Sequence, residues 1–523
     1  MGQLYWNGTI HTMEQAGTVE AVLVENGRVC WAGALSQVEH LPNLKKIDLE
    51  GCTMIPAFLD PHSHFTAAAN ALLQADLSEC VNFQEVEERI RDFIRDSRIP
   101  EGTWVTAQGY DQNALAENCH PTLALLDRAA PHHPLLVQHK SGHMGVVNTL
   151  GLKRLGITPQ TQPPEGGAIG VKDGHLTGYL EENAFISYQK KVPMADLEKM
   201  MEAYRGAQKL YLSYGITTVQ EGLLAPQMVP LYRGLLASGL LQVDLVGYAE
   251  ERTAGEVEAA FPDHIRQYKD HFKLGGYKIF LDGSPQGRTA WMRRPYEGER
   301  EYRGYPTLTD RQVTEALTHA SENGMQLLAH CNGDGAAEQL IRCMESLRQA
   351  GTDLADLRPV LIHGQLLGVD QLDSVKELGL AVSFFTAHTW HWGDVHLKNF
   401  GWDRGSHITP AASALARGIP FTFHQDTPVL PPDMLETIWC AVNRRTASGA
   451  SLPEGIPAYA ALAAVTRTAA WQYFEEGEKG SIAPGKRADF AVLSRDPLQV
   501  RPEEIREVRV LRTIKDGRTL YEA

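Results

Sequence analysis

The sequence lacks the cysteine pattern of a disulfide framework or a zinc ribbon. Its seven cysteines are odd in number and never form a C-x-x-C pair. It also lacks any apolar run near the roughly 20 residues that span a bilayer. The first residues, MGQLYWNGTIHTM, contain neither the basic nor the apolar segment of a signal peptide. These absences predict a cytoplasmic protein that has no membrane partner.

Basic residues are too few for a partner that carries many phosphates. Lys and Arg number 49 against 64 Asp and Glu, which gives a net charge of -15. Such a balance repels nucleic-acid backbones and anionic membrane surfaces. We therefore expect a small-molecule substrate and no nucleic acid. The same charge is compatible with a monomer or with a homo-oligomer.

The composition, with 43% hydrophobic residues, 47 Gly and 28 Pro, is that of a globular protein with a large core. Both ends of the chain have the pattern of a β-hairpin. AVLVE and RVCWAG flank the turn Asn26-Gly27, and RTIK and RTLYEA flank the turn Asp516-Gly517. Both termini are therefore predicted to be β.

Short β-branched or aromatic runs alternate with helical stretches between the two ends, a rhythm typical of βα units. Eight such strands are predicted, and eight parallel strands favour an α/β fold of the TIM type, a closed (β/α)₈ barrel. The gap after the first strand is too long for one crossover helix, so we expect an inserted subdomain at about 70–205. The predicted strands lie near 53–64, 215–222, 242–249, 275–282, 325–331, 358–365, 379–388 and 419–427.

Polar residues stand at the carboxyl ends of several of these strands. In DPHSH, Asp60, His62 and His64 share one face, because residues two apart in a strand point to the same side. The same position recurs at His330, His363, His424 and Asp426. A single histidine in such a place is most often structural. Together, however, His62, His64, His330, His363 and Asp426 form a nitrogen-rich set with one carboxylate, which suits zinc or a related divalent ion.

Several motifs resemble the metal-dependent amidohydrolase superfamily over nearly the whole chain. They are DPHSH, the strand-end histidines, the late Asp426 and the closing GSIAPGKRADFAVLSRDP. LDGSPQGRTAWMRRPY, HTWHWGDVH, FHQDTPVLPPD and AVNRRT are similar to the branch, amidohydrolase family 3, that includes N-substituted formamide deformylase. The resemblance implies a barrel at 53–479 and a small β-sandwich built from 1–52 and 480–523.

Lys278, in the strand GGYKIFLDGS, shares a face with Phe280 and Asp282 and is expected to point into the barrel. A charged lysine there has a large desolvation cost unless it is paired or chemically changed. One interpretation is an ion pair with Asp282 or Glu221. The resemblance to two-metal members implies another, a carbamate on Lys278 whose oxygens bridge two metal ions. Glu221 is then the alternative bridge, or a substrate contact.

The resemblance also implies how the ligands are shared. His62, His64 and Asp426 would hold the more buried metal ion, and His330 and His363 would hold the other. Asp426 would act as general base and then general acid in hydrolysis of an amide, formamide or cyclic amide.

Three other functions were compared with this hypothesis. A lactone or phosphoester hydrolase would use the same metal ions. A one-metal deaminase is disfavoured, because Cys331-Asn332-Gly333-Asp334 follows His330 without the expected glutamate. A noncatalytic regulatory or binding protein is disfavoured, because every expected ligand has a candidate.

Substrate contacts are expected in the insertion and in the loops after the last strands, since barrel active sites lie at the carboxyl face. The candidates are His143 in HKSGHMGVVN, Glu221, Trp390 and Trp392 in HTWHWGDVH, and His424. Aromatic residues in this position more often belong to the core. Their place at a strand end nevertheless predicts an apolar or aromatic group in the substrate.

Overall fold

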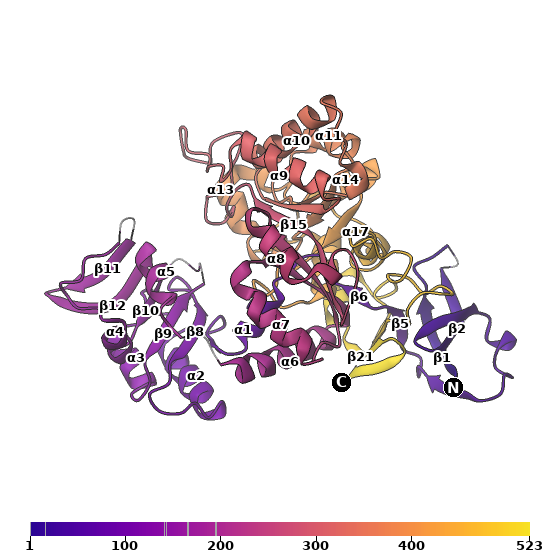
Figure 1. Ribbon diagram of the computed structural model, residues 1–523, viewed down its shortest axis with the longest axis horizontal. Coiled ribbons are helices and arrows are strands. Elements are labelled where there is room, and N and C mark those ends of the chain that lie inside the picture. Colours follow the sequence, from indigo (N-terminus) through magenta and orange to yellow (C-terminus); the bar gives the residue numbers. More distant parts are fainter. Residues whose placement is uncertain (1, 16, 141, 143, 165–166, 194–195) are drawn as a thin grey trace. The chain divides into compact units, whose positions relative to one another are not determined.

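The computed structural model describes residues 2–15, 17–140, 142, 144–164, 167–193 and 196–523. The predicted substrate contact His143 lies outside these residues. The chain divides into two compact units, which Figure 1 colours along the sequence. The larger unit comprises Met1–Thr66 with Ala207–Ala523, and the smaller unit is Ala67–Gly206.

The centre of the larger unit is a sheet of eight parallel strands that neighbour one another in chain order, β6-β13-β14-β15-β16-β17-β18-β19. Each overlaps one of the segments predicted from the sequence, so the eight strands are confirmed. They are β6 (Phe58–Leu59), β13 (Ile216–Leu224), β14 (Asp244–Glu250), β15 (Phe272–Phe280), β16 (Gln326–Cys331), β17 (Val360–His363), β18 (Ala381–Phe384) and β19 (Phe421–Phe423).

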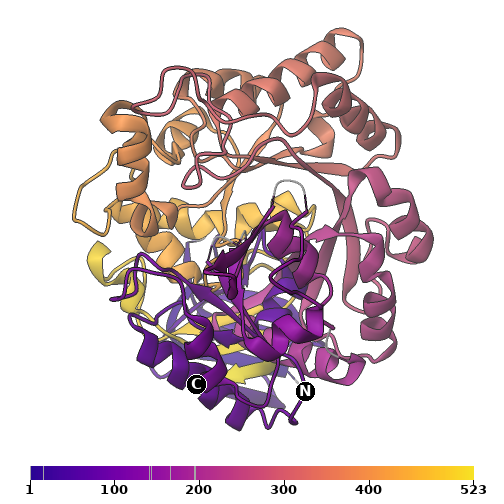
Figure 2. The ribbon, with the colours of Figure 1, turned by 90° about the vertical axis from the view of Figure 1, so that its left-hand side faces the viewer.

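The two edge strands of this sheet meet at their carboxyl ends. The backbone N–H of His64, after β6, donates to the carbonyl of Thr427, after β19, over 2.8 Å. The sheet is therefore curled, as a TIM-like barrel requires. Figure 2 shows helices, from magenta to orange, around the outside of the strands. They include α7 (Val229–Ala237), α8 (Ala254–Ala260), α9 (Asp310–Glu322), α10 (Asp334–Gln349), α11 (Leu372–Glu377) and α14 (Ala411–Arg417).

Helix α17 (Arg467–Gln472) packs against side chains of the barrel strands. Ala469, Ala470 and Tyr473 form one buried cluster with strand residues that include Leu59 and Tyr248. The cluster fills the space between the strands with apolar groups, as in other barrels of this type. It also brings the hydroxyl group of Tyr473 close to the first strand.

Strands from both ends of the chain share a second sheet, in the order β22-β21-β20-β5-β1-β2-β3 with β4 paired to β1. The hairpins predicted at Asn26-Gly27 and Asp516-Gly517 are present. The hydrogen bonds form one continuous sheet, and its division into a two-layered sandwich stays a prediction. The strands are β1 (Gly2–His11), β2 (Thr18–Glu25), β3 (Arg28–Gly33), β4 (Leu44–Asp48), β5 (Thr53–Pro56), β20 (Phe490–Leu493), β21 (Val510–Lys515) and β22 (Arg518–Glu522).

The predicted first barrel strand, 53–64, divides in two in the structure. Its first part is β5, which pairs with β1 and β20 in the terminal sheet, and only β6 belongs to the barrel. Both parts are fully buried, so the sequence shows one apolar run where the chain passes from one sheet to the other.

A buried ionic contact connects the terminal sheet to the barrel. The carboxylate of Asp244, at the start of β14, lies 2.7 Å from Nζ of Lys515 in β21 and 2.5 Å from Nζ of Lys479. Nδ1 of His271 is 2.7 Å from the same carboxylate. Burial alone would raise the pKa of Asp244, but Lys479 and Lys515 together hold it well below its usual value.

The smaller unit has its own six-stranded sheet, in the order β11-β12-β10-β9-β8-β7. Apolar residues of its helices and strands form a separate core, which includes Val86, Ile90 and Leu126. The strands are β7 (Ala75–Asp76), β8 (Val105–Tyr110), β9 (Leu135–His139), β10 (Met144–Val147), β11 (Gly167–Lys172) and β12 (His175–Glu182), with helices α2 (Phe83–Asp96), α3 (Leu123–Ala129), α4 (Thr149–Leu155) and α5 (Asn183–Gln189).

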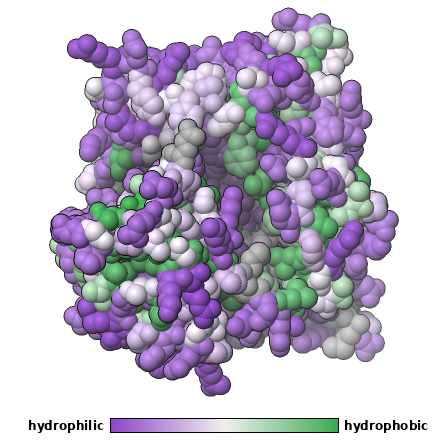
Figure 3. All heavy atoms as spheres, turned by 60° about the vertical axis from the view of Figure 1, so that its left-hand side comes forward, coloured by the Kyte–Doolittle hydropathy of each residue, from purple (hydrophilic) through white to green (hydrophobic). Residues whose placement is uncertain are grey.

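On the face shown in Figure 3, hydrophilic residues predominate and apolar residues lie in separate groups. Of the helices in the described residues, none combines the length and the apolar character that crossing a bilayer requires.

Candidate metal centre

His62, His64 and Asp426 bring three ligand atoms together where the edge strands of the barrel meet. One ring nitrogen of each histidine and one carboxylate oxygen lie within 4.8 Å of one another. Oδ1 of Asp426 is 3.3 Å from Nε2 of His62 and 3.5 Å from Nε2 of His64. All three residues follow the ends of β6 and β19 rather than lying within them.

Local backbone structure holds these side chains in place. The carboxylate of Asp60 accepts a hydrogen bond from the backbone N–H of His62 over 3.3 Å. Asp426 has φ of 54°, in the left-handed region that aspartate tolerates better than most residues. Its carboxylate faces the two histidines of the first strand end.

The charges of this group fit a bound cation. Oδ1 of Asp426 is buried and has no hydrogen-bond partner among the described residues. The pKa of His62 lies well below its usual value because burial disfavours the imidazolium form and Lys278 adds to the effect. A neutral imidazole therefore stands beside a buried carboxylate. Two imidazoles with one carboxylate are donors that suit a divalent ion such as zinc.

Lys278 lies in the same buried region. Its Nζ has no hydrogen-bond partner among the described residues and lies 5.3 Å from the ring centroid of Phe280. Burial lowers the pKa of Lys278 to about 7, and Asp426 opposes this only in part. At neutral pH a large fraction of this side chain is thus an uncharged amine.

The ion pair of Lys278 considered from the sequence does not form, because its two candidate partners have other contacts. The carboxylate of Asp282 accepts from the backbone N–H groups of Trp291, Asn332 and Gly333. Glu221 accepts from the Tyr232 hydroxyl and the Thr66 backbone N–H, both over 2.8 Å. Its other oxygen is 3.8 Å from Nδ1 of His64.

Three further histidines lie around this group, two of them on the neighbouring strands β16 and β17 and the third directly after β19. The ring centroids of His330 and His363 are 4.6 Å apart, and that of His363 is 5.4 Å from His62. His424 lies 5.0 Å from both His62 and His363, and both of its ring nitrogens are buried without a partner among the described residues. The structure thus brings the five predicted ligands and His424 together, and their individual roles stay predictions.

The two tryptophans predicted to contact substrate face different surroundings. The ring of Trp392 lies 6.1 Å from Phe385, whose own ring is 6.4 Å from His363. Trp390 packs 5.2 Å from Trp439, and the guanidinium of Arg506 is 5.2 Å from its ring. Of the two, Trp392 is therefore the one connected to the histidines by neighbouring rings.

Sequence reasoning missed one contact of the centre. Oε1 of the buried Gln220 lies 2.7 Å from Nδ1 of His62, and its Nε2 donates to Tyr473 Oη over 3.1 Å. Neither Gln nor Tyr has the chemistry of a preferred zinc ligand, so the metal pattern gave no reason to select them. The only feature of the sequence that pointed to Gln220 was its place next to Glu221 in TTVQEG.

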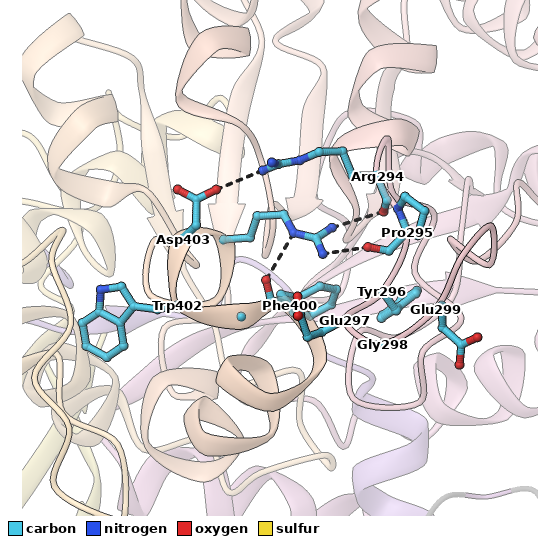
Figure 4. Close-up of a pocket in the computed structure, with 11 residues that line it drawn as sticks. Arg294, Pro295, Tyr296, Glu297, Gly298, Glu299, Phe400, Trp402 and Asp403 are labelled. Atoms are coloured by element: carbon cyan, nitrogen blue, oxygen red, sulfur yellow. Dashed lines mark hydrogen bonds and ion pairs between the residues drawn. The ribbon is translucent and has the colours of Figure 1, made fainter.

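A cavity of about 520 Å³ lies apart from these residues (Figure 4). Arg294 pairs with Asp403 over 3.2 Å, and Arg404 donates to the carbonyls of Arg294 and Pro295. The Trp402 ring points away from the other labelled side chains. Its lining, residues 294–299 and 400–404, includes none of the predicted metal ligands.

The amino-acid sequence is similar to known proteins over nearly its whole length. The sequence profile of the amidohydrolase family matches residues 45–521. The chain is 27% identical to the putative amidohydrolase YtcJ of Bacillus subtilis, over 100% of both proteins. It is 28% identical to N-substituted formamide deformylase of Arthrobacter pascens, over 99% of this chain and 97% of that protein.

The fold also matches solved structures. An uncharacterized metal-dependent hydrolase from Pyrococcus horikoshii superposes with a TM-score of 0.79 at 22% identity, and the match covers 96% of this chain and 99% of the other. At this identity the likeness supports the fold alone.

Proposed function

Because the chain belongs to the amidohydrolase family, and is an enzyme of the metal-dependent hydrolase class, we propose that it cleaves a non-peptide carbon–nitrogen bond. The bond would be that of an amide, a formamide or a cyclic amide. The single observation that carries the proposal is the convergence of His62, His64 and Asp426 at one point of the barrel. Similarity to a formamide deformylase over 99% of the chain favours this bond type.

The ligands divide between two positions in this proposal. His62, His64 and Asp426 would hold one divalent ion, for which the nitrogen donors favour zinc, and His330 and His363 would hold a second. Metal ions bound there would polarise the carbonyl group of the substrate and lower the pKa of water.

Asp426 moves the proton in this reaction. Its carboxylate would take the proton of the attacking water and return it to the nitrogen of the leaving amine, so that the carbon–nitrogen bond breaks without releasing an amide anion. Oδ1 of this carboxylate lies within 3.5 Å of Nε2 of both His62 and His64, which places Asp426 at the centre of the site.

Lys278 supplies a bridging group in the two-metal form of the proposal. Its neutral amine would add to carbon dioxide and release one proton, which gives a carbamate whose single negative charge is shared by two oxygens. Burial without a partner, and a pKa lowered to about 7, favour the neutral amine that this step needs. Glu221 is less suited to bridge, because Tyr232 and Thr66 already bind one of its oxygens.

A deaminase is disfavoured by the contacts after β16. The Asn332 side chain donates to the Gly283 carbonyl over 2.9 Å. The carboxylate of Asp334 binds the backbone N–H and the guanidinium of Arg293, at 2.8 and 3.1 Å. The carboxylate nearest to His330 along the following chain is thus engaged elsewhere.

A substrate panel tests the proposal. The metal-loaded protein is offered N-formyl and N-acyl amines with apolar or aromatic groups, then cyclic amides, lactones and phosphotriesters. We expect the first set to have the highest kcat/KM, and activity to disappear with a chelator and return with Zn²⁺. Preferred cleavage of a lactone or phosphotriester would overturn the bond assignment and leave the metal centre intact.

A further inference from the structure

The contacts of Gln220 determine which way its side-chain amide points. Its Nε2 lies 2.7 Å from the carbonyl oxygen of Pro61, which can only accept a hydrogen bond. It also lies 3.1 Å from Oη of Tyr473, whose hydroxyl hydrogen is donated to the carbonyl of Asp60 over 2.5 Å. Both hydrogens of the amide nitrogen are therefore used, and the nitrogen cannot exchange places with the oxygen.

The oxygen of Gln220 consequently faces Nδ1 of His62, at 2.7 Å. An amide oxygen only accepts, so Nδ1 must carry the proton. A neutral imidazole has one N–H, which leaves Nε2 with its lone pair. That lone pair is directed to the side where Oδ1 of Asp426 lies at 3.3 Å.

The arrangement is rigid because every member is buried. His62, Gln220 and Tyr473 are each at most 2% exposed. Gln472, at the end of α17, also donates to the carbonyl of Pro61, over 2.9 Å. Gln220 and Gln472 thus donate to the same backbone carbonyl, and of these two described residues it is Gln220 that hydrogen-bonds the imidazole.

We infer that Gln220, oriented by Tyr473 and the Pro61 carbonyl, is a positioning residue that selects the Nδ1–H tautomer of His62 and so prepares Nε2 to bind the metal ion. This inference deepens the proposed function and rests on His62 being a ligand. A partner of the second ring nitrogen typically changes metal affinity by about 10- to 100-fold when it is removed.

The first test reads the tautomer directly in the full-length protein after chelation of metal. Nitrogen NMR of ¹⁵N-histidine-labelled protein, with the His62 signals identified by their loss in His62→Asn, should show a protonated Nδ1 and an unprotonated Nε2. A protonated Nε2 in the wild type would overturn the inference. This measurement needs no activity, so absent hydrolysis would count against the proposed function and not against Gln220.

The second test measures Zn²⁺ affinity by competition with a chelator. Gln220→Met should bind Zn²⁺ about 10- to 100-fold more weakly. Gln472→Met is the matched control, since it removes the other donor to Pro61 and should retain the tautomer and bind Zn²⁺ nearly as the wild type does.

Two further results would contradict the inference. One is wild-type affinity and tautomer in Gln220→Met. The other is an equal loss of affinity in Gln472→Met, which would assign the effect to the Pro61 backbone. If Gln220→Met does not fold, the tautomer of the wild-type protein decides the question.

Discussion

Nε2 of His62 lies 3.3 Å from Oδ1 of Asp426, although the two residues follow strands at opposite edges of the barrel sheet. The candidate metal centre is therefore complete only when the edges of the sheet meet. A ligand that binds the folded state alone stabilises that state. Metal binding and closure of the barrel should accordingly be coupled, and a chelator should lower the Tm of the protein.

Replacing His62 or His64 by Ala should lower both the metal content and the turnover, because each change removes a ligand nitrogen. Metal content is measured by elemental analysis after purification in metal-free buffer. His40→Ala, at an exposed position, is the control and should retain the metal. Full metal content and activity in both ligand variants would show that the metal is held elsewhere.

Lys278→Ala should empty at least one metal position and should regain part of the metal and activity when short carboxylic acids are added. The acids supply the two oxygens that an unmodified lysine lacks. Lys278→Arg tests the same point, because arginine keeps the positive charge but cannot form a carbamate. This variant should therefore also lose metal from at least one position. An unmodified amine at Lys278 in the fully metal-loaded enzyme, seen by electron density, would refute the bridge.

Asp426→Asn should lower kcat by at least about 10² to 10⁴, the usual range for loss of a general acid–base group, while much of the fold is retained. The amide has nearly the same shape as the carboxylate but cannot take up the proton. Circular dichroism and metal content, measured on the same preparation, separate this effect from unfolding. Wild-type turnover in the variant would contradict the proton-transfer role.

Lys479→Met should destabilise the protein by about 3 to 5 kcal/mol, because it removes one of the cations from the buried carboxylate of Asp244. The free energy of unfolding is measured from urea transitions. Lys269→Met is the control: Lys269 pairs with Asp263 at the surface, and its loss should leave the midpoint unchanged.

The contribution of Asp244 to stability should depend on pH. Its pKa is depressed in the folded protein, so in acid the unfolded chain binds more protons at this group than the folded chain does. The contribution is therefore fully present above the unfolded pKa of about 3.9 and is lost as the pH falls through the depressed value. Asp244→Asn should flatten this part of the pH profile, and an unchanged profile would contradict the assignment.

Trp392→Ala should raise KM for N-formyl amines with aromatic groups more than for those with small aliphatic groups. Trp390→Ala should instead lower the Tm, because its ring packs against Trp439 and Arg506. Steady-state kinetics and thermal unfolding are measured for both variants, so that each variant serves as the control for the other. A larger KM effect in Trp390→Ala would reverse the two roles.

The barrel strands could be predicted from the sequence because each is a short apolar run between helical stretches, and several have a polar residue at the carboxyl end. The exception is 53–64, where burial in two successive sheets produces one unbroken apolar pattern. The pattern of apolar residues in a sequence indicates which residues are buried, but it does not indicate which sheet buries them. The transition from β5 to β6 was for this reason invisible.

The candidate site was predictable only in part, for a related reason. Histidine and aspartate at strand ends have a recognisable metal chemistry, so His62, His64 and Asp426 could be selected from the sequence. Trp390 and Trp392 could not be told apart, because they are two residues apart near the short helix α12 (His388–His391), where such residues point in different directions. Gln220 depends on contacts with Pro61 and Tyr473 that only the folded barrel creates.

Lys515 reaches Asp244 inside the barrel from the second-to-last strand of the terminal sheet. During synthesis, the barrel strands therefore emerge from the ribosome before this counter-charge does. The final neutralisation of Asp244 has to wait for the hairpin that contains Lys515. The barrel therefore cannot be transferred on its own: a segment cut out at 53–479 and grafted elsewhere would lose the ammonium group of Lys515 and the strands β1 and β20 that pair with β5.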